Sequence, residues 1–223
     1  SQWDPANPKN KYEGTKEQWD HAQSVMAKIL DDLDVKYDIG IDEAAFYGPK
    51  LDIQYKNVYG KEDTLVTIQI DMLLAERFGM YYTDENGEKK LPYIIHRTSL
   101  GCYERTLAYL IEHYAGALPT WMAPEQVRFL PVTDRAVDYC KEQAAKLTAQ
   151  GYRVTVDTRS EKIGKKIRDA QMEKIPYMLI VGDRDIEAGT VSPRHRADGD
   201  LGAMTLDAFT AVLKDVVDNK LKK

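Results

Sequence analysis

Three polar side chains alternate with apolar ones in the stretch from Thr67 to Asp71. Thr67, Gln69 and Asp71 face one side of an extended chain, because successive side chains of a strand point to opposite sides, and Ile68 and Ile70 face the other. Such a row of hydroxyl, amide and carboxylate groups could recognise an adenosine or a small hydroxylated amino acid. It could equally be a solvent-exposed face, and the alternation alone leaves both interpretations open.

A second group joins a histidine, two arginines and a glycine between an expected strand and an expected helix. The apolar run Pro92–Ile95 suits a buried strand, His96–Ser99 is a polar break, and Gly101 opens a helix, with Arg97 and Arg105 close by. Backbone N–H groups at a helix start and guanidinium groups both bind phosphate. A cation at a helix start opposes the helix dipole, which gives some support to an anionic partner for Arg105.

Two further features could contribute chemistry to the same region. Gly48 and Pro49 interrupt the approach to a strand and would leave Tyr47 and Lys50 beside a cleft, although a Tyr near Gly-Pro is more often packed or exposed. No second His or Cys lies at ligand spacing from His96. The residues alone therefore favour a structural hydrogen bond for this histidine over a metal.

Basic residues gather in two places in the last third of the chain. One cluster contains Lys162, Lys165, Lys166 and Arg168, and the other contains Arg194, His195 and Arg196. A charged helix is normally a solvated face, but a local basic surface can also bind RNA. The charge pattern does not decide between these alternatives.

The first half of the chain predicts helices around an antiparallel β region. A helix should follow Thr15 as N-cap, strands should include LDIQY and LVTIQIDM with a turn at Tyr59–Asp63, and Asp84–Gly87 should be a hairpin turn. The helix opened by Gly101 should end at Gly116. The apolar face expected on the first helix consists of Trp19, Ala22, Val25, Met26, Ile29 and Leu33.

The second half of the chain predicts alternating strands and helices. Strands are expected in VRFLPV, YRVTVD, PYMLIVG and Val191–Arg196, and helices in Asp134–Gln150, Ser160–Ile175 and Leu206–Leu221. This alternation gives a mostly parallel or mixed sheet covered by helices. The fold class is therefore α/β (α+β), with an antiparallel sheet and helices first and an α/β domain second.

Composition limits the class of protein. The chain has 223 residues, 43% hydrophobic and 30% charged, with a net charge of −5. Cys102 and Cys140 are far apart, so neither a disulfide framework nor a CxxC metal site is indicated, and a reducing cytoplasm fits. No run of eighteen apolar residues and no signal-type N-terminus is present, so we expect no membrane span and no export.

Several stretches resemble one protein family in its own order. LGCYERTLAYLIEHYAGALP is similar to motif 3 of the class II aminoacyl-tRNA synthetases, and the adjoining IIHR and AGALP narrow the resemblance to the threonyl-tRNA synthetases. AFYGPKLDIQ, TIQID, ERF and EKIGKKIRDAQMEKIPYMLIVGD agree with it. The resemblance implies the end of a catalytic domain in residues 1–122 and an anticodon-binding domain in residues 123–223.

The resemblance also implies roles for individual residues. Arg105, with Lys50, would act in catalysis, and Tyr47, Thr67, Gln69, Asp71 and Arg105 would bind ATP or substrate. His96 matches one protein ligand of a threonine-recognising zinc. The residues that match anticodon contacts or lie in the basic cluster beside them are Ser160, Lys162, Lys166, Asp185 and Arg194. Ser160 and Asp185 depart from the family's usual Asn and Glu, as Thr64 and Leu65 depart from its usual residues.

The implied activity is ATP-dependent activation of threonine and its transfer to tRNA(Thr), with Mg²⁺ accompanying ATP and a homodimer in the family. Motifs 1 and 2 and the partner zinc ligands do not occur in this sequence. We therefore expect this chain alone to be inactive and its zinc site to be absent or weak. A non-catalytic tRNA-binding or regulatory relative is the alternative, and a prolyl or glycyl synthetase piece is a third interpretation.

Overall fold

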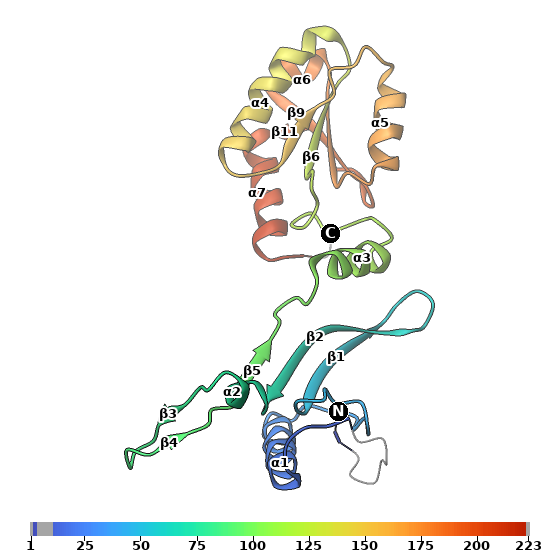
Figure 1. Cartoon of the computed structure of the whole chain (residues 1–223). Coiled ribbons are helices and arrows are strands. Elements are labelled where there is room, and N and C mark those ends of the chain that lie inside the picture. The colour runs from blue at the N-terminus through green and yellow to red at the C-terminus, as the bar shows by residue number, and fades with distance from the viewer. Residues whose placement is uncertain (1, 4–10, 222–223) are drawn as a thin grey trace. The chain divides into compact units, whose positions relative to one another are not determined.

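The computed structural model describes Gln2, Trp3 and residues 11–221 (Figure 1). The chain divides into two compact units, unit 1 (Ser1–Tyr109) and unit 2 (Leu110–Lys223). Helix α3 (Tyr103–His113) begins in unit 1 and ends in unit 2. Within residues 11–221, no helix combines the length and the apolar character that crossing a membrane requires.

Unit 1 begins with helix α1 (Lys16–Asp32), and the predicted N-cap at Thr15 is confirmed. The Thr15 hydroxyl accepts from the Gln18 N–H at 3.3 Å, and the Gln18 side chain accepts from the Thr15 N–H at 2.8 Å. This reciprocal capping box fixes the first turn of the helix. Trp19 then packs edge-on against Tyr12, with ring centroids 5.2 Å apart.

The predicted apolar face of α1 is only partly correct. Trp19 and Ala22 are buried as expected, but the third buried residue is Leu30, and Leu33 is 67% exposed. Val25 and Ile29 are exposed as well. The Trp19 ring packs against aromatic residues of the preceding segment, and Leu30, about three helical turns further on, lies on the same side of the helix, whereas Ile29 does not.

The main sheet of unit 1 is antiparallel, as predicted. Strand β1 (Lys50–Lys56) pairs with β2 (Glu62–Asp71), and β2 pairs with β5 (Ile94–Arg97). Short helix α2 (Leu74–Arg77) follows β2. The predicted hairpin turn joins β3 (Tyr82–Thr83) to β4 (Lys89–Lys90).

Two expectations for the segment after this hairpin are wrong. The strand is Ile94–Arg97 instead of Pro92–Ile95, and it is not buried: Ile95 is 58% exposed. The strand forms an edge of the three-stranded sheet, so it has a strand neighbour on one side only among the described residues. In α3, the helical spacing of the apolar residues is as predicted, but none of its residues is buried.

Unit 2 is a mixed sheet with helices, as predicted. Strand β6 (Val127–Pro131) pairs in parallel with β7 (Val154–Val156) and β8 (Tyr177–Val181), whereas β9 (Thr190–His195) pairs antiparallel with β8. The sheet order is β10-β9-β8-β6-β7, with β11 also on β9. The added strands β10 (Gly199–Asp200) and β11 (Met204–Thr205) are short and were not predicted.

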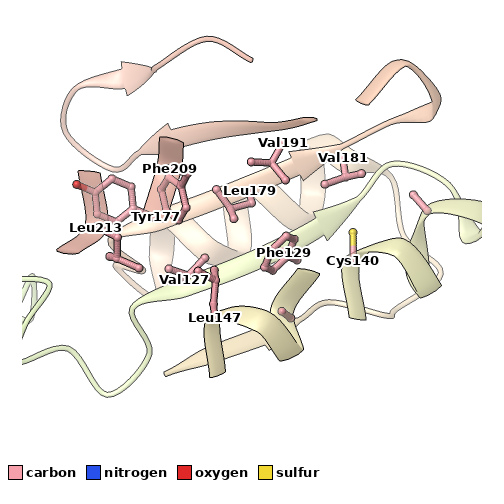
Figure 2. Packing of buried hydrophobic residues seen from close by; sticks show 12 residues of the cluster. Val127, Phe129, Cys140, Leu147, Tyr177, Leu179, Val181, Val191, Phe209 and Leu213 are labelled. Carbon is pink, nitrogen blue, oxygen red and sulfur yellow. The ribbon is translucent and has the colours of Figure 1, made fainter. Parts of the chain in front are cut away.

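The helices of unit 2 follow the strands in the expected order. A 3₁₀ turn (Asp134–Ala136) leads into α4 (Val137–Ala149), α5 (Ile163–Met172) follows β7, and α7 (Leu206–Asp218) closes the unit. Helix α6 (Asp183–Ala188) was not predicted. Figure 2 shows the core, in which apolar side chains of β6, β8 and β9 meet those of α4 and α7, including Phe129, Leu147 and Phe209.

Candidate functional site

A row of polar side chains crosses the sheet of unit 1. In the strand register Gln69 on β2 lies opposite Lys50 on β1 and opposite His96 on β5, and Thr67 lies opposite Asp52. Directly opposed residues in an antiparallel sheet project to the same face. The predicted polar face of β2 is therefore continued onto both neighbouring strands.

Asp71 and His96 form a pair on this face in which only the carboxylate is fully buried. The Asp71 side chain is fully buried, and its carboxylate lies 2.8 Å from His96 Nε2. The same carboxylate accepts the backbone N–H groups of Leu73 and Leu74, each at 2.9 Å. Burial raises the pKa of Asp71, but the hydrogen bonds from Leu74, His96 and Leu73 outweigh it and hold the pKa below its usual value.

Tyr47 joins the row from the loop that precedes β1. Its hydroxyl donates to Gln69 Oε1, and its ring lies edge-on to His96 with centroids 5.8 Å apart. Burial, with the nearby Asp71 carboxylate, raises the pKa of Tyr47, so the phenol stays protonated. Gly48 permits this approach because a Cβ there would lie 1.7 Å from the Ile70 carbonyl oxygen.

Lys50 and Thr67 are linked through Asp52, a residue that the sequence argument did not select. Lys50 Nζ lies 2.6 Å from Asp52 Oδ2, and the Thr67 hydroxyl donates to Asp52 Oδ1 at 2.6 Å. The alternation that placed Thr67 and Gln69 on one face applies equally to Lys50 and Asp52. Applying it to β1 as well would have found Asp52.

Arg105 lies near the start of β2, at the opposite end of this strand from Asp71. It is exposed on α3, and its guanidinium donates to the Thr64 carbonyl at 3.0 Å. Thr64 is seven residues from Asp71 on β2, roughly 20 Å along a strand. Gly101 allows α3 to start against β2, because a Cβ there would lie 2.2 Å from the Leu65 carbonyl oxygen. The structure thus gathers Tyr47 with the Gln69, Asp71 and His96 end of the face and places Arg105 near the other end.

The arrangement resembles half of a metal site. A metal-binding histidine commonly directs its other ring nitrogen to a carboxylate, and Asp71 holds Nε2 of His96 in that manner. Among the described residues, however, no group of three or more His, Cys, Asp or Glu side chains could hold a metal ion. His96 fits as one ligand, and the described residues supply no complete ligand set around it.

The basic residues of unit 2 divide into outward and inward groups. Lys162 is exposed at the N-cap of α5, next to exposed Ser160. Lys166, one turn later, is only 4% exposed, and its Nζ donates to the carbonyls of Pro131 and Asp157, each at 3.1 Å. The ammonium of Lys166 therefore joins α5 to the ends of two strands.

The second basic cluster is also partly internal. Arg196 donates to the carbonyls of Ala117, Leu118 and Lys174 at 2.6–2.8 Å, and burial lowers its pKa from the ordinary value. His195 is buried against Tyr177. Arg196, which the sequence places in a charged cluster, therefore holds the segment after α3 against the rest of unit 2.

Asp185 and Arg194 lie on neighbouring elements of unit 2. The Asp185 carboxylate accepts the Gly182 N–H at 2.9 Å and the Ser192 hydroxyl at 2.9 Å, which ties α6 to β9. Arg194 is half-buried on β9, and its Nε has no hydrogen-bond partner within the described part of the chain. An unpaired guanidinium N–H of this kind costs stability unless a ligand or water meets it.

Two family models match the chain. Residues 7–114 match the tRNA synthetase class II core domain (G, H, P, S and T), and residues 126–216 match an anticodon binding domain. The contact-defined units divide the chain at a nearby position, between residues 109 and 110.

Named relatives agree with these models. The threonine–tRNA ligase of Clostridium perfringens (strain SM101) is 57% identical over 209 residues, which cover 94% of this chain and 32% of the relative. That of Clostridium botulinum (strain Eklund 17B) is 54% identical over 220 residues, 99% of this chain and 34% of the relative. The chain thus spans about a third of the length of these curated relatives.

A solved structure has the same fold. The RNA binding domain of threonyl-tRNA synthetase from Cryptosporidium parvum Iowa II superposes with a TM-score of 0.83 at 33% identity, covering 94% of this chain and 53% of that one. A putative threonyl-tRNA synthetase from Aeropyrum pernix, at 24% identity and a TM-score of 0.66, supports the fold alone. The chain therefore combines part of a class II tRNA synthetase core with an anticodon binding domain, and over most of its length it is similar to threonine–tRNA ligases.

Proposed function

We propose that the chain is the part of a threonine–tRNA ligase that supplies one side of the aminoacylation site and reads the anticodon. Residues 1–122 belong to the catalytic domain in this proposal, and residues 123–223 form the anticodon-binding domain. The two matched family models and the similarity to threonine–tRNA ligases support these two roles. The substrates are threonine, ATP with Mg²⁺, and tRNA(Thr).

The observation that carries the proposal is the buried Asp71 carboxylate, which contacts the partly exposed His96 beside Gln69 and Tyr47. A fully buried carboxylate that keeps its charge and orients one imidazole is costly to maintain in an ordinary sheet face. The cost is understandable if this face recognises a small polar substrate. Thr67, Gln69 and Tyr47 then provide hydroxyl, amide and phenol groups for threonine or for adenosine.

Each cation has a separate role in this proposal. Arg105 neutralises phosphate charge on ATP as the threonine carboxylate attacks the α-phosphorus and pyrophosphate leaves. Lys50, held at 2.6 Å from Asp52, adds positive charge at the other end of the face. His96 would be one ligand of a zinc ion through the nitrogen that does not face Asp71. Bound zinc supplies a Lewis acid for the amino and hydroxyl groups of threonine.

The anticodon-binding part uses residues of α5, α6 and β9 in this proposal. Ser160 and Lys162 at the start of α5, Asp185 on α6 and Arg194 on β9 are the proposed contacts. Exposed Lys162 attracts the phosphate backbone, whereas Arg194 and Asp185 can hydrogen-bond splayed bases. Lys166 acts indirectly here, because its ammonium holds α5 in place. The complete enzyme is a cytoplasmic homodimer in this proposal.

A chimaera tests the catalytic half of the proposal. The corresponding third of the Clostridium perfringens relative is replaced by this chain, and charging of tRNA(Thr) with threonine is measured. We expect activity, and Arg105→Ala should lower kcat by about 10²–10³-fold because transition-state charge loses its partner. Arg77→Ala is the matched control, since Arg77 is an exposed arginine of unit 1 that lies 3.8 Å from Glu13.

The other outcomes separate the alternatives. This chain alone should show no threonine-dependent ATP–pyrophosphate exchange. A folded chimaera without exchange would favour a non-catalytic tRNA-binding relative, and exchange with proline or glycine would favour those synthetases instead. Binding of tRNA(Thr) to this chain, compared with the same tRNA carrying a changed anticodon at two salt concentrations, tests the second half. Equal binding to both, lost at higher salt, would contradict anticodon reading.

A further inference from the structure

Unit 2 contains a cavity that the proposed tRNA contacts do not use. Its volume is about 410 Å³, and it lies between the C-terminal half of α7 and the turn that joins β9 to β10. The walls are largely apolar, with Leu201, Val212, Val216 and Leu221 among the lining residues. Tyr177, Asp198 and Asp215 are the lining residues that carry a hydroxyl or a charge.

Tyr177 presents an unusual polar group to this cavity. The residue is only 2% exposed, and its ring packs against Phe209 and His195. Figure 2 shows its hydroxyl at the outer end of the core cluster, pointing away from the other labelled side chains. The hydroxyl is not among the fully buried atoms that lack a partner, and it makes no side-chain hydrogen bond within the described residues, so it opens onto the cavity. The phenol thus provides an unused donor and acceptor beside the cavity.

The charges that line the cavity are negative. Asp198 lies 3.0 Å from His195 Nδ1, and Asp215 accepts from the Asn219 side chain at 2.7 Å. Neither carboxylate pairs with a Lys or Arg within residues 11–221. Burial, together with the Asp198 charge, raises the pKa of Tyr177, which keeps the phenol neutral.

The neighbouring cations have other partners. Lys214 pairs with Asp218, the Lys220 ammonium lies 5.8 Å from the Trp121 ring centroid, and Arg196 donates to three backbone carbonyls. The cavity therefore combines a negative potential, one phenol hydroxyl that can accept a hydrogen bond, and apolar walls. A group that matches all three features is an ammonium on an aliphatic chain.

We propose that this cavity binds an aliphatic primary ammonium group, which donates to the Tyr177 oxygen and to the Asp198 or Asp215 carboxylate while its methylene chain contacts the apolar walls. The ammonium can come from a free amine or from a lysine side chain. Lys222 and Lys223 directly follow Leu221, a lining residue, and lie outside the described residues. The lining residues include none of the proposed anticodon contacts.

Titration of the 223-residue chain with hexylamine, followed by ¹H–¹⁵N chemical shifts, tests the proposal. We expect saturable shifts centred on Tyr177, Leu201 and the C-terminal half of α7, and weaker binding at high salt. Tyr177→Phe, which removes only the hydroxyl, should weaken binding about tenfold, and Asp215→Asn about threefold to tenfold, because each loses a charge-assisted interaction. Asp207→Asn, on the same helix but not lining the cavity, should leave the affinity unchanged.

Two controls decide the outcome. Hexanol has the same chain without the charge and should bind much more weakly, so equal shifts with hexanol would overturn the proposal. Unchanged affinity in both Tyr177→Phe and Asp215→Asn, with native spectra, would also overturn it. A chain lacking Lys222 and Lys223 distinguishes the sources: tighter hexylamine binding identifies these lysines as the competing occupant, and unchanged binding identifies a free amine.

Discussion

The two units of this chain bury their apolar residues to very different extents. Unit 2 has a core cluster that connects three strands with α4 and α7, and a second cluster under α5. Among its described residues, unit 1 has one small cluster around Trp19. Most of the exposed large apolar side chains of the described chain lie in unit 1, and those of unit 2 are Ile111, Val132, Met172 and Val212.

Because of this difference, we expect unit 2 to fold by itself, whereas unit 1 is organised around its polar face. A closed core gives unit 2 the burial that an independent domain needs. Unit 1 leaves the apolar residues of β5 and α3 uncovered while enclosing Asp71 completely. Large exposed apolar surfaces normally mark an interface. We therefore expect unit 1 to be the less stable unit and unit 2 to unfold independently of it.

The largest expected effect is in thiol reactivity, because each unit carries one cysteine. Cys102 in unit 1 is exposed, whereas Cys140 in unit 2 is fully buried, and burial raises its pKa to about 12. Cys140 should react with a thiol reagent at least about a thousandfold more slowly, since its reaction requires opening of a core worth several kcal/mol. Mass spectrometry of a labelling time course measures both rates. Similar rates at the two sites would show that unit 2 is not closed.

The pH dependence of the stability of unit 2 provides a second test of the closed core around Cys140. A thiol whose pKa is raised by folding contributes stability that is present below its unfolded pKa, about 8.5, and is lost as the pH rises towards about 12. Unit 2 should therefore become less stable across this range. Cys140→Ala should make the free energy of unfolding of unit 2 less dependent on pH in this range.

A core truncation should destabilise only the unit that contains it. Phe129 is fully buried in β6, so Phe129→Ala should cost unit 2 about 3–5 kcal/mol in the free energy of unfolding. Leu107→Ala, at a 53% exposed position of α3, should cost less than about 0.5 kcal/mol. Urea unfolding monitored by the NMR signals of each unit measures both values. A loss of unit 1 signals at the midpoint of unit 2 in Phe129→Ala would contradict independent unfolding.

The same contrast explains what the sequence could predict. Alternation and turn residues were enough for the β1–β2 pairing and for the strand and helix order of unit 2, because short-range patterns and a complete core agree there. Burial was predicted only partly correctly in α1 and wrongly in β5. Ile95 has the composition of a core strand, but its exposure depends on which layers cover it, and no local pattern carries that information.

The contacts of polar side chains could also be predicted only in part from the sequence. The face of Thr67, Gln69 and Asp71 follows from periodicity, whereas the Asp71–His96 contact depends on the register between β2 and β5. Lys166 and Lys162 have the same chemistry and lie four residues apart, yet one is buried and the other exposed. Only the packing of α5 against the strand ends distinguishes them.

Substitution of Asp71 tests how far the site contributes to unit 1. Asp71→Asn should destabilise unit 1 by about 1–3 kcal/mol at neutral pH, because the amide cannot accept from His96 and both backbone N–H groups equally well. In the parent chain the depressed pKa means that the carboxylate contribution is present above about pH 3.9 and is lost as the pH falls through the folded pKa. Acid unfolding of unit 1, monitored by near-UV circular dichroism, should lose this component in Asp71→Asn. Identical acid midpoints would contradict the assignment.

The smallest expected effect separates the two lysines of α5. Lys162→Met removes an exposed charge and should lower the slope of log K against log salt for tRNA(Thr) by about 0.7–0.9, with unit 2 stability unchanged. Lys166→Met should leave the salt slope nearly unchanged, because the Lys166 ammonium is buried and donates to the Pro131 and Asp157 carbonyls. The same substitution should destabilise unit 2 by about 1–3 kcal/mol, because both hydrogen bonds are lost. Filter binding at four salt concentrations and urea unfolding give both quantities for each variant. If Lys166→Met reduced the slope as much as Lys162→Met while unit 2 kept its stability, Lys166 would be an RNA contact and α5 would not need its ammonium as an anchor.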